Sequence, residues 1–354
     1  MIKVEDHNRR SIMSDRTVTI REIARSAGVS PSTVFRALKK ENLVKPATRA
    51  KVLAAQRLLQ SERAQDTARS NGSSITVGII MPVSTAQDID HHPSMFVTVT
   101  SFLSELSGGN ISNSVLVFDE NTMRGEDLLP HPMDGYLIIG TNEEQEKMIL
   151  PVLSRAGLPC VLINRHAEAP HISCVNIDDM AACENATRYL ISLGHKRIAY
   201  LSGSKNYQHT KRRQNGYVSA MNEAGLGVRS EWVINGDYSE TSGYTMGTAL
   251  ARLKNRPTAA ICASDTIAIG CIHAMEEKGI AVPADFSVVG FGDIESSRII
   301  TPALTTVAQP SVDIGTIAAK VLMQMIRMPI IVRQQLMLQT RMIIRNSAAA
   351  APEK

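Results

Sequence analysis

The sequence has 354 residues, of which 44% are hydrophobic and 20% are charged, with a formal net charge of +4. A chain of this length and apolar content can bury the cores of two or three domains, which excludes a largely disordered protein. No apolar run approaches the roughly 20 residues of a membrane-spanning helix, and the N-terminus lacks the apolar core of a signal peptide. We therefore expect a cytoplasmic protein.

Charge is distributed unevenly along the chain. Residues 1–70 hold 15 Lys and Arg against 7 Asp and Glu, whereas the remainder holds 23 against 27. A basic N-terminal segment on an acidic body indicates that the N-terminal part binds a polyanion such as nucleic acid. A merely solvated basic face is the alternative that charge by itself leaves open.

Cysteine spacing and catalytic motifs give no sign of redox, metal or enzyme chemistry. The segment "DIDHH" (88–92) is expected to be a solvated loop rather than a metal site. No P-loop, GxGxxG or GxSxG sequence occurs, so we predict no enzyme activity, no cofactor and no bound metal. The five cysteines lack CxxC spacing and are expected to be reduced core residues: Cys160, Cys174, Cys183, Cys262 and Cys271.

The first predicted helix begins after Thr19. Thr19 and Glu22 have the spacing of a capping box, in which each side chain accepts a hydrogen bond from the other residue's backbone. Apolar residues then recur with the 3.6-residue period, and Gly28 can adopt the left-handed conformation that ends a helix. The pattern predicts a short helix that closes at Gly28.

A second helix is predicted directly afterwards. Ser30 can cap it and Pro31 suits its first position, where the missing amide hydrogen would lack a partner in any case. Val34 and Leu38 are expected to face inward. Ser32 and Arg36, four residues apart, share a polar outward face.

These helices predict a helix-turn-helix, whose second member lies in the major groove of DNA. A third amphipathic segment, "TRAKVLAAQRLL" (48–59), would complete a small core, because helices this short are not stable alone. An ordinary helical hairpin is the alternative on spacing alone.

Beyond "NGSSITVGIIMP", short β-rich runs alternate with helical stretches, which is typical of parallel sheets covered by helices. Two clusters of strands, divided near residue 165, predict two similar lobes. The predicted fold is thus an all-α helix-turn-helix headpiece followed by a two-lobed α/β core. Ligands of such folds bind at the carboxyl ends of strands, which points to the cleft between the lobes.

The segment "TIREIARSAGVSPSTVFRALKKENLVKPATRAKVLAA" resembles the headpiece of the lactose-repressor/galactose-repressor (LacI/GalR) family of bacterial transcription regulators. "YLISLGHKRIAYLSG" and "TPALTTVAQP" resemble the core of the same family, which is like the periplasmic sugar-binding proteins. The implied organisation is a headpiece (17–60), a hinge or linker (61–74) and an effector-binding and dimerisation domain (75–347), between tails at 1–16 and 348–354. The expected lobes are 75–165 with 295–325, and 166–294 with 326–347.

The resemblance implies roles for residues of the headpiece and the hinge. Pro31 and Ser32 would choose bases, and Arg36 would anchor the reading, because a guanidinium can bond O6 and N7 of guanine together. Phosphate contacts are implied for Thr19, Thr33, Lys45 and Thr48.

Two positions depart from the family pattern. Phe35 stands where the family has a backbone-contacting serine, so it either packs on a thymine methyl or a sugar, or lies on the headpiece. The hinge lacks the family's proline and has Asn71 in place of the minor-groove leucine. Arg69 is therefore either a minor-groove contact or part of a flexible linker.

For the effector, the resemblance implies that Arg213, three residues before Gly216, binds the small molecule. An arginine fork can hold sugar hydroxyls or a carboxylate. A solvated basic run at 211–213 is the alternative without the resemblance. Asp265 is expected to cap the helix that runs to residue 278. The other implied effector residues are Phe96, Asn164, Tyr207, His209, Ser264 and Asp293.

The function implied is that of a homodimeric repressor, controlled by a sugar or sugar acid, that binds double-stranded DNA at a near-palindromic operator. Assembly of dimers into tetramers stays open. The alternatives are a cytoplasmic sugar-binding protein without a DNA role, an activator with a non-sugar effector, a sugar-modifying enzyme, and a core that binds a protein partner instead of a small molecule.

Overall fold

A computed structural model of the chain divides into two compact units, residues 1–76 with 126–134, and residues 77–125 with 135–354. The predicted hinge, with Arg69 and Asn71, and the segment 88–92 lie outside the described residues. The structure describes residues 19–39, 44–45, 47–49, 51–56, 59, 75–81, 93–107, 111–117, 124–129, 133–165, 172–328 and 333–353.

Helix α1 (Ile20–Ala27) begins with the predicted capping box. Thr19 Oγ1 accepts a hydrogen bond from the Glu22 amide at 3.4 Å, and Glu22 Oε2 accepts one from the Thr19 amide at 2.8 Å. Gly28 ends the helix with a φ of 64°, in the left-handed region that favours glycine. Both boundaries of the first helix are confirmed.

Helix α2 (Pro31–Lys39) is capped by Ser30, whose Oγ accepts from the Thr33 amide at 3.2 Å. Val34 is buried, but the expectation for Leu38 is wrong, because 37% of Leu38 is exposed and Ala37 is buried instead. Residues 47–49 and 51–56 are also helical. The core of this unit consists of Ile23, Ala24, Val34, Ala37, Val52 and Ala55.

Removal of the first cap tests this part of the fold. We expect Thr19→Ala to destabilise α1 by about 1 kcal/mol, because the Glu22 amide loses its acceptor. Hydrogen–deuterium exchange of the α1 amides should quicken accordingly. Ser26→Ala, on the exposed surface of the same helix, is the control and should leave their exchange unchanged.

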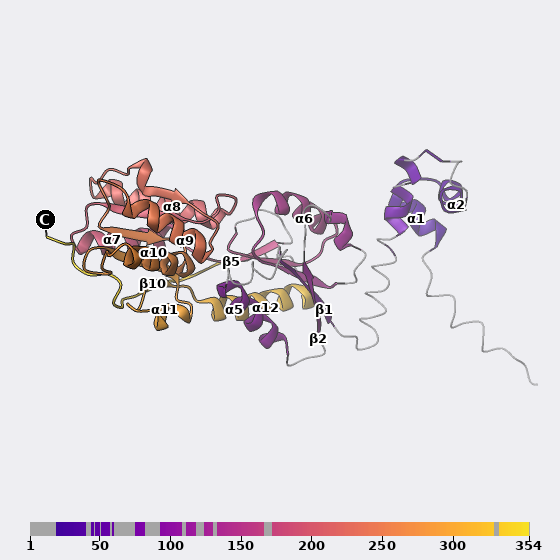
Figure 1. The fold of residues 1–354 in the computed structure, drawn as a ribbon. Coiled ribbons are helices and arrows are strands. Elements are labelled where there is room, and N and C mark those ends of the chain that lie inside the picture. The colour runs from indigo at the N-terminus through magenta and orange to yellow at the C-terminus, as the bar shows by residue number, and fades with distance from the viewer. Residues whose placement is uncertain are drawn as a thin grey trace, which may run out of the picture. The chain divides into compact units, whose positions relative to one another are not determined.

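The first sheet has the strand order β11-β5-β4-β3-β1-β2. The chain moves one way from β1 through α5 to β2 and the other way from β3 through α6 to β4, and right-handed connections then place α5 and α6 on opposite faces. Figure 1 shows this arrangement, with α12 packed beside α5. The strands are β1 (Ile75–Met81), β2 (Ile111–Val117), β3 (Gly135–Ile138), β4 (Cys160–Ile163), β5 (Ile172–Ile177) and β11 (Gln335–Leu338), and the helices are α5 (Pro93–Leu106), η2 (Gly125–Leu128), α6 (Glu143–Arg155) and α12 (Ser311–Arg327).

The second sheet has the order β12-β10-β9-β8-β6-β7, and only the pairing of β12 with β10 is antiparallel among those described. Helix α7 packs with α8, and α9 packs with α10, as expected for opposite faces of a doubly wound sheet. The strands are β6 (Ile198–Ser202), β7 (Val233–Asn235), β8 (Ala259–Cys262), β9 (Ser287–Gly292), β10 (Thr305–Ala308) and β12 (Arg341–Ile343), and the helices are α7 (Asp179–Ser192), α8 (Gln208–Glu223), η3 (Ser230–Trp232), α9 (Glu240–Ala251), α10 (Asp265–Glu277) and α11 (Ser296–Ile299).

The expected division into lobes is wrong at its boundaries. Strands β5 and β11 belong to the first sheet, although 166–294 and 326–347 were expected in the second lobe, and β10 belongs to the second sheet. The chain therefore passes between the sheets after β5, β10 and β11. All of these strands are short apolar runs, and only long-range pairing decides which sheet each one joins.

All five cysteines are free and buried, which confirms their expected place in the core. Within the described residues, no helix is long and apolar enough to cross a membrane.

Candidate functional site

A cavity of about 110 Å³ opens at the carboxyl ends of strands from both sheets. Ile139–Thr141 follow β3, Ile163–Arg165 complete and follow β4, and Ser264–Thr266 follow β8. Segments at the starts of α5 and α8 supply further walls. The cavity lies where open parallel sheets bind their ligands.

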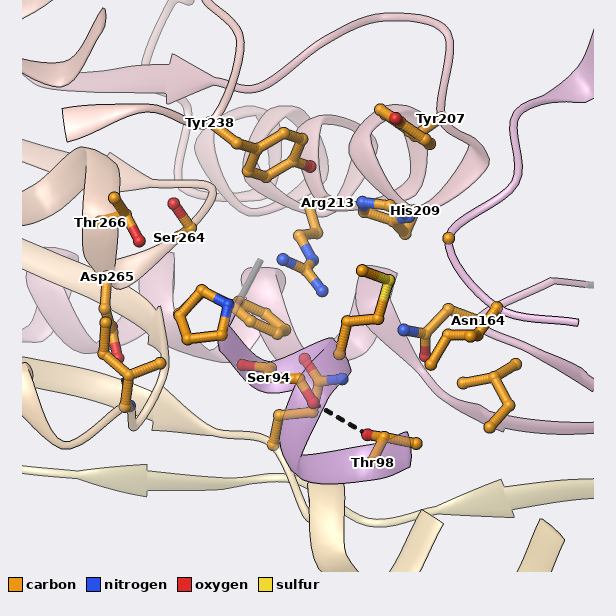
Figure 2. Close-up of a pocket in the computed structure, with 18 of the residues that line it drawn as sticks. Ser94, Thr98, Asn164, Tyr207, His209, Arg213, Tyr238, Ser264, Asp265 and Thr266 are labelled. Carbon is orange, nitrogen blue, oxygen red and sulfur yellow. Dashed lines mark hydrogen bonds between the residues drawn. The ribbon is translucent and has the colours of Figure 1, made fainter. Parts of the chain in front are cut away.

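Five of the predicted effector residues line this cavity: Asn164, Tyr207, His209, Arg213 and Ser264. Figure 2 shows Arg213 reaching in among the other side chains, with Tyr207 and His209 on one side and Ser94 and Thr98 on the other. Their contact with an effector stays a prediction.

Arg213 is held rigidly in the wall. It is 5% exposed, its Nε donates to Asp179 Oδ1 at 2.7 Å and its Nη1 donates to the Ala263 carbonyl at 2.7 Å. Its Cζ lies 3.6 Å from the centroid of the Phe291 ring. Burial raises the pKa of Asp179, and the facing Arg213 opposes part of that rise.

The basic run at 211–213 is thus not a uniformly solvated face. Lys211 and Arg212 are partly exposed and pair with Glu143 at 2.9 Å and Asp178 at 3.2 Å, whereas Arg213 is buried. Within the described chain, Arg213 Nη2 makes no hydrogen bond, so this nitrogen is available to a ligand.

Gly216 explains how Arg213 reaches Asp179. A Cβ at residue 216 would lie 2.1 Å from the Met180 carbonyl oxygen, so glycine allows α8 to pack directly on the start of α7. Because Asp179 opens α7, this close approach brings the carboxylate to the guanidinium. The glycine serves packing, and through packing it serves the cavity.

We expect Gly216→Ala to lower the free energy of unfolding by about 1–3 kcal/mol, because α8 must move away from the α7 backbone. Urea denaturation followed by circular dichroism measures the loss. Gly227→Ala is the matched control, since a Cβ there meets no atom within 4 Å. Equal stability of the two variants would contradict the packing role.

Aromatic side chains form another part of the wall. The rings of Tyr207 and His209 stack with centroids 5.3 Å apart, and Tyr238 lies 5.7 Å from His209. The Tyr238 hydroxyl is 2.6 Å from Thr210 Oγ1, and burial raises the pKa of Tyr238 to about 12. Tyr238 is absent from the sequence-based set, because a tyrosine with a φ of 74° in a loop after β7 leaves no periodic signal.

The expectation that Asp265 caps α10 is wrong. Ser264 is the cap, and its Oγ accepts from the Ile267 amide at 3.2 Å. Asp265 is fully buried and accepts from Thr306 Oγ1 at 2.5 Å and from the Ile294 amide at 2.9 Å. Burial raises the pKa of Asp265 to about 6.

Two predicted effector residues do not line the cavity. Asp293 is held by Arg345 at 2.5 Å and Arg298 at 2.8 Å. Partial burial acts to raise the pKa of Asp293, but the hydrogen bonds from these arginines outweigh it and the pKa is lowered. Phe96 lies on α5 between Ser94 and Thr98, which share the face toward the cavity at i and i+4, so the helical period turns Phe96 aside.

Arg165 also lines the cavity and is missing from the sequence-based set. It directly follows Asn164, one residue beyond the predicted position at the carboxyl end of β4. The rule that ligands bind at the carboxyl ends of strands could have indicated it.

The predicted DNA-reading residues lie on or near α2. Arg36 is exposed and its Nε donates to the Ser32 carbonyl at 3.2 Å, and Phe35 is 49% exposed. Pro31 and Ser32 are exposed as well, so the polar outward face is confirmed, whereas contact with DNA stays a prediction. The predicted phosphate contacts are exposed at Thr19 and Lys45 and half-buried at Thr33 and Thr48.

Comparison with known proteins agrees with both the helix-turn-helix headpiece and the two-lobed core. Residues 19–60 match the model described as "Bacterial regulatory proteins, lacI family", and residues 187–348 match the "Periplasmic binding protein-like domain". The chain is 33% identical over 320 residues to Catabolite control protein A of Priestia megaterium, covering 86% of this chain and 91% of the relative. It is 29% identical over 331 residues to the Probable HTH-type transcriptional repressor ExuR of Bacillus subtilis (strain 168), covering 93% and 98%.

Among solved structures, the complex of the transcriptional regulator CelR with cellobiose is similar, with a TM-score of 0.71 and 26% identity over 93% of this chain and 99% of that one. The expected headpiece and two-lobed core are both confirmed. The chain belongs to the LacI family of bacterial regulatory proteins.

Proposed function

We propose that this chain is a sequence-specific DNA-binding repressor whose affinity for its operator is controlled by a small molecule in the cavity. The observation that carries the proposal is the buried Arg213 in a cavity lined by residues of both sheets, in a chain that also has a helix-turn-helix. A ligand in such a cavity contacts both lobes at once.

Contact with both lobes provides the means of control. A molecule bound at the carboxyl ends of both sheets favours one relative orientation of the lobes, and the segments after β5, β10 and β11 carry the adjustment. The effector changes operator affinity only by its different affinities for the two states, typically by about 1–3 kcal/mol. Tight binding alone is therefore not sufficient.

At the DNA, α2 is the element proposed to lie in the major groove, with Pro31, Ser32 and Arg36 toward the base edges. Two copies related by a twofold axis read a near-palindromic duplex, since the symmetry of the protein is repeated in the site. The residues proposed to hold phosphates are Thr19, Thr33, Lys45 and Thr48.

A sugar or sugar acid suits the cavity. The rings of Tyr207, His209 and Tyr238 offer flat apolar faces, while Arg213, Asn164 and Ser264 offer hydrogen-bonding groups. The similar CelR structure holds cellobiose, and the relatives are transcriptional regulators, which supports a binding role without catalysis.

Selection from fragmented genomic DNA, followed by gel shift against bulk competitor, tests the DNA role. We expect one near-palindromic class of sites to be enriched at moderate ionic strength, where non-specific binding is weak. A panel of sugars, sugar acids and sugar phosphates should contain a compound that raises the melting temperature with concentration and weakens the shift. Enrichment of no sequence, with or without the panel, overturns the proposal.

A further inference from the structure

Arg165 is a buried guanidinium with unused donors. Its backbone is fixed by Asn176, whose side chain accepts from the Arg165 amide at 2.8 Å and donates to its carbonyl at 2.9 Å. Arg165 is 6% exposed, and its Nη2 donates to Glu146 Oε2 at 2.6 Å. Its Nε and Nη1 are buried and have no hydrogen-bond partner among the described residues. Buried donors without acceptors are unfavourable, so a missing acceptor is indicated.

The carboxylates described around the cavity already have other partners. Glu146 accepts from Thr141 Oγ1 at 2.9 Å as well as from Arg165. Asp179 accepts from Arg213, and Asp265 accepts from Thr306 and from the Ile294 amide. None of these carboxylates accepts from Nε or Nη1 of Arg165, and a bound molecule can supply that acceptor.

The starts of two helices at the cavity favour an anion. Helices α5 and α8, of 14 and 16 residues, both begin at the cavity. The N-terminus of a helix carries a partial positive charge. These partial charges add to the unused nitrogens of Arg165 and of Arg213.

Asn164, which precedes Arg165 in the sequence, needs a hydrogen-bond donor rather than an acceptor. Asn164 Oδ1 is buried and has no hydrogen-bond partner among the described residues, so it needs a donor such as a hydroxyl group. Figure 2 shows Asn164 and Arg213 on different sides of the group of lining side chains. One molecule that carries both an acid group and hydroxyl groups can accept hydrogen bonds from the arginine nitrogens and donate one to Asn164 Oδ1.

The volume of the cavity restricts the class of ligand further. The cavity measures about 110 Å³, and an engineered apolar cavity of about 150 Å³ in another protein holds a single benzene molecule. By this comparison the volume favours a ligand with one ring over a disaccharide or a nucleotide. A monoanionic carboxylate is favoured over a phosphate dianion, since burial of a second charge near Asp265 adds a desolvation penalty.

We propose that the effector is a monosaccharide-sized hydroxy acid, and that Arg165 selects it by binding its carboxylate together with Arg213. This inference rests on the proposed function, because it names the chemistry of the same cavity. It makes Arg165 a specificity-determining residue.

Matched pairs of sugars test the selection by calorimetry on the full chain: glucuronate with glucose, galacturonate with galactose, and gluconate with glucitol. We expect at least one acid to bind about 10- to 100-fold more tightly than its neutral partner, the ratio expected for hydrogen bonds to a charged group. Glucose 6-phosphate distinguishes binding of a phosphate from binding of a carboxylate, and it is expected to bind more weakly than that acid. Equal affinity within every pair, absence of binding by every acid, or tighter binding of the phosphate overturns the proposal.

Variants assign the selectivity to Arg165. Arg165→Gln alone leaves Glu146 buried without its partner, so the Arg165→Gln/Glu146→Gln pair is used, and Glu146→Gln alone is the control. The double variant should lose the acid preference by about 10- to 100-fold and keep its affinity for the neutral sugar within about 2-fold, and the control should keep the preference. Equal losses for acid and neutral sugar overturn the role of Arg165. Operator binding, measured on the same preparations, tests the proposed function separately.

Discussion

The Arg213→Ala variant is expected to lose both its response to the effector and about 3–5 kcal/mol of folding stability. The stability loss follows from Asp179, which is 3% exposed and would remain buried without the guanidinium that lies 2.7 Å away. The Ala263 carbonyl would lose its donor as well. Urea denaturation of the variant measures this effect.

A second variant separates stability from recognition. Arg213→Met with Asp179→Asn removes the buried charges together and keeps most of the volume, so the free energy of unfolding should return toward that of the wild type. Operator binding should then be normal and insensitive to the effector. If the double variant still responds to the effector, Arg213 does not bind it, and if Arg213→Ala is as stable as wild type, the pair with Asp179 is not buried in solution.

The Arg36→Ala variant is expected to lose discrimination between operator and unrelated DNA while the core stays folded. A bidentate contact with guanine supplies about 1–3 kcal/mol of discrimination per base pair, and a symmetric dimer makes the contact twice. Competition gel shifts should show a fall of the specificity ratio by roughly 10- to 100-fold for each half-site. The Arg36 side chain is exposed, so its removal leaves no buried partner unpaired.

Lys45→Ala is the matched control for that experiment. Lys45 is exposed outside α2 and is proposed to hold a phosphate. Its loss should weaken binding to all sequences about equally and lower the slope of log affinity against log salt by about 1. An unchanged specificity ratio in Arg36→Ala would remove α2 from the base-reading role.

The sequence predicted the headpiece well because its signals are local. The capping box at Thr19 and Glu22, the turn at Gly28 and the cap at Ser30 each depend on residues within a few positions of one another, and the structure contains all of them. The one misplaced side chain, Leu38, shows the limit of a short amphipathic pattern. In a helix of nine residues, either of two adjacent apolar positions can face the core.

Many residues of the cavity could also be predicted from the sequence. The carboxyl end of β4 and the starts of α8 and α10 are local features, and they place Asn164, Tyr207, His209, Arg213 and Ser264 around one space once parallel sheets are assumed. The family resemblance selected these positions, and the rule by itself indicated only the cleft at the strand ends.

Long-range contacts decided the rest. Strand pairing within each sheet placed β5, β10 and β11 in lobes other than those expected. The sequence of a short apolar strand does not show which strand it will pair with. Arg345, 52 residues away in the chain, holds Asp293 out of the cavity. Glu146, 19 residues from Arg165, takes one of its nitrogens and leaves others without a partner. Side-chain pairing across such separations depends on the packed fold. The sequence therefore determined which helices and strands form and where a ligand binds. Only the tertiary structure decided which charged groups of the cavity keep donors without a partner among the described residues.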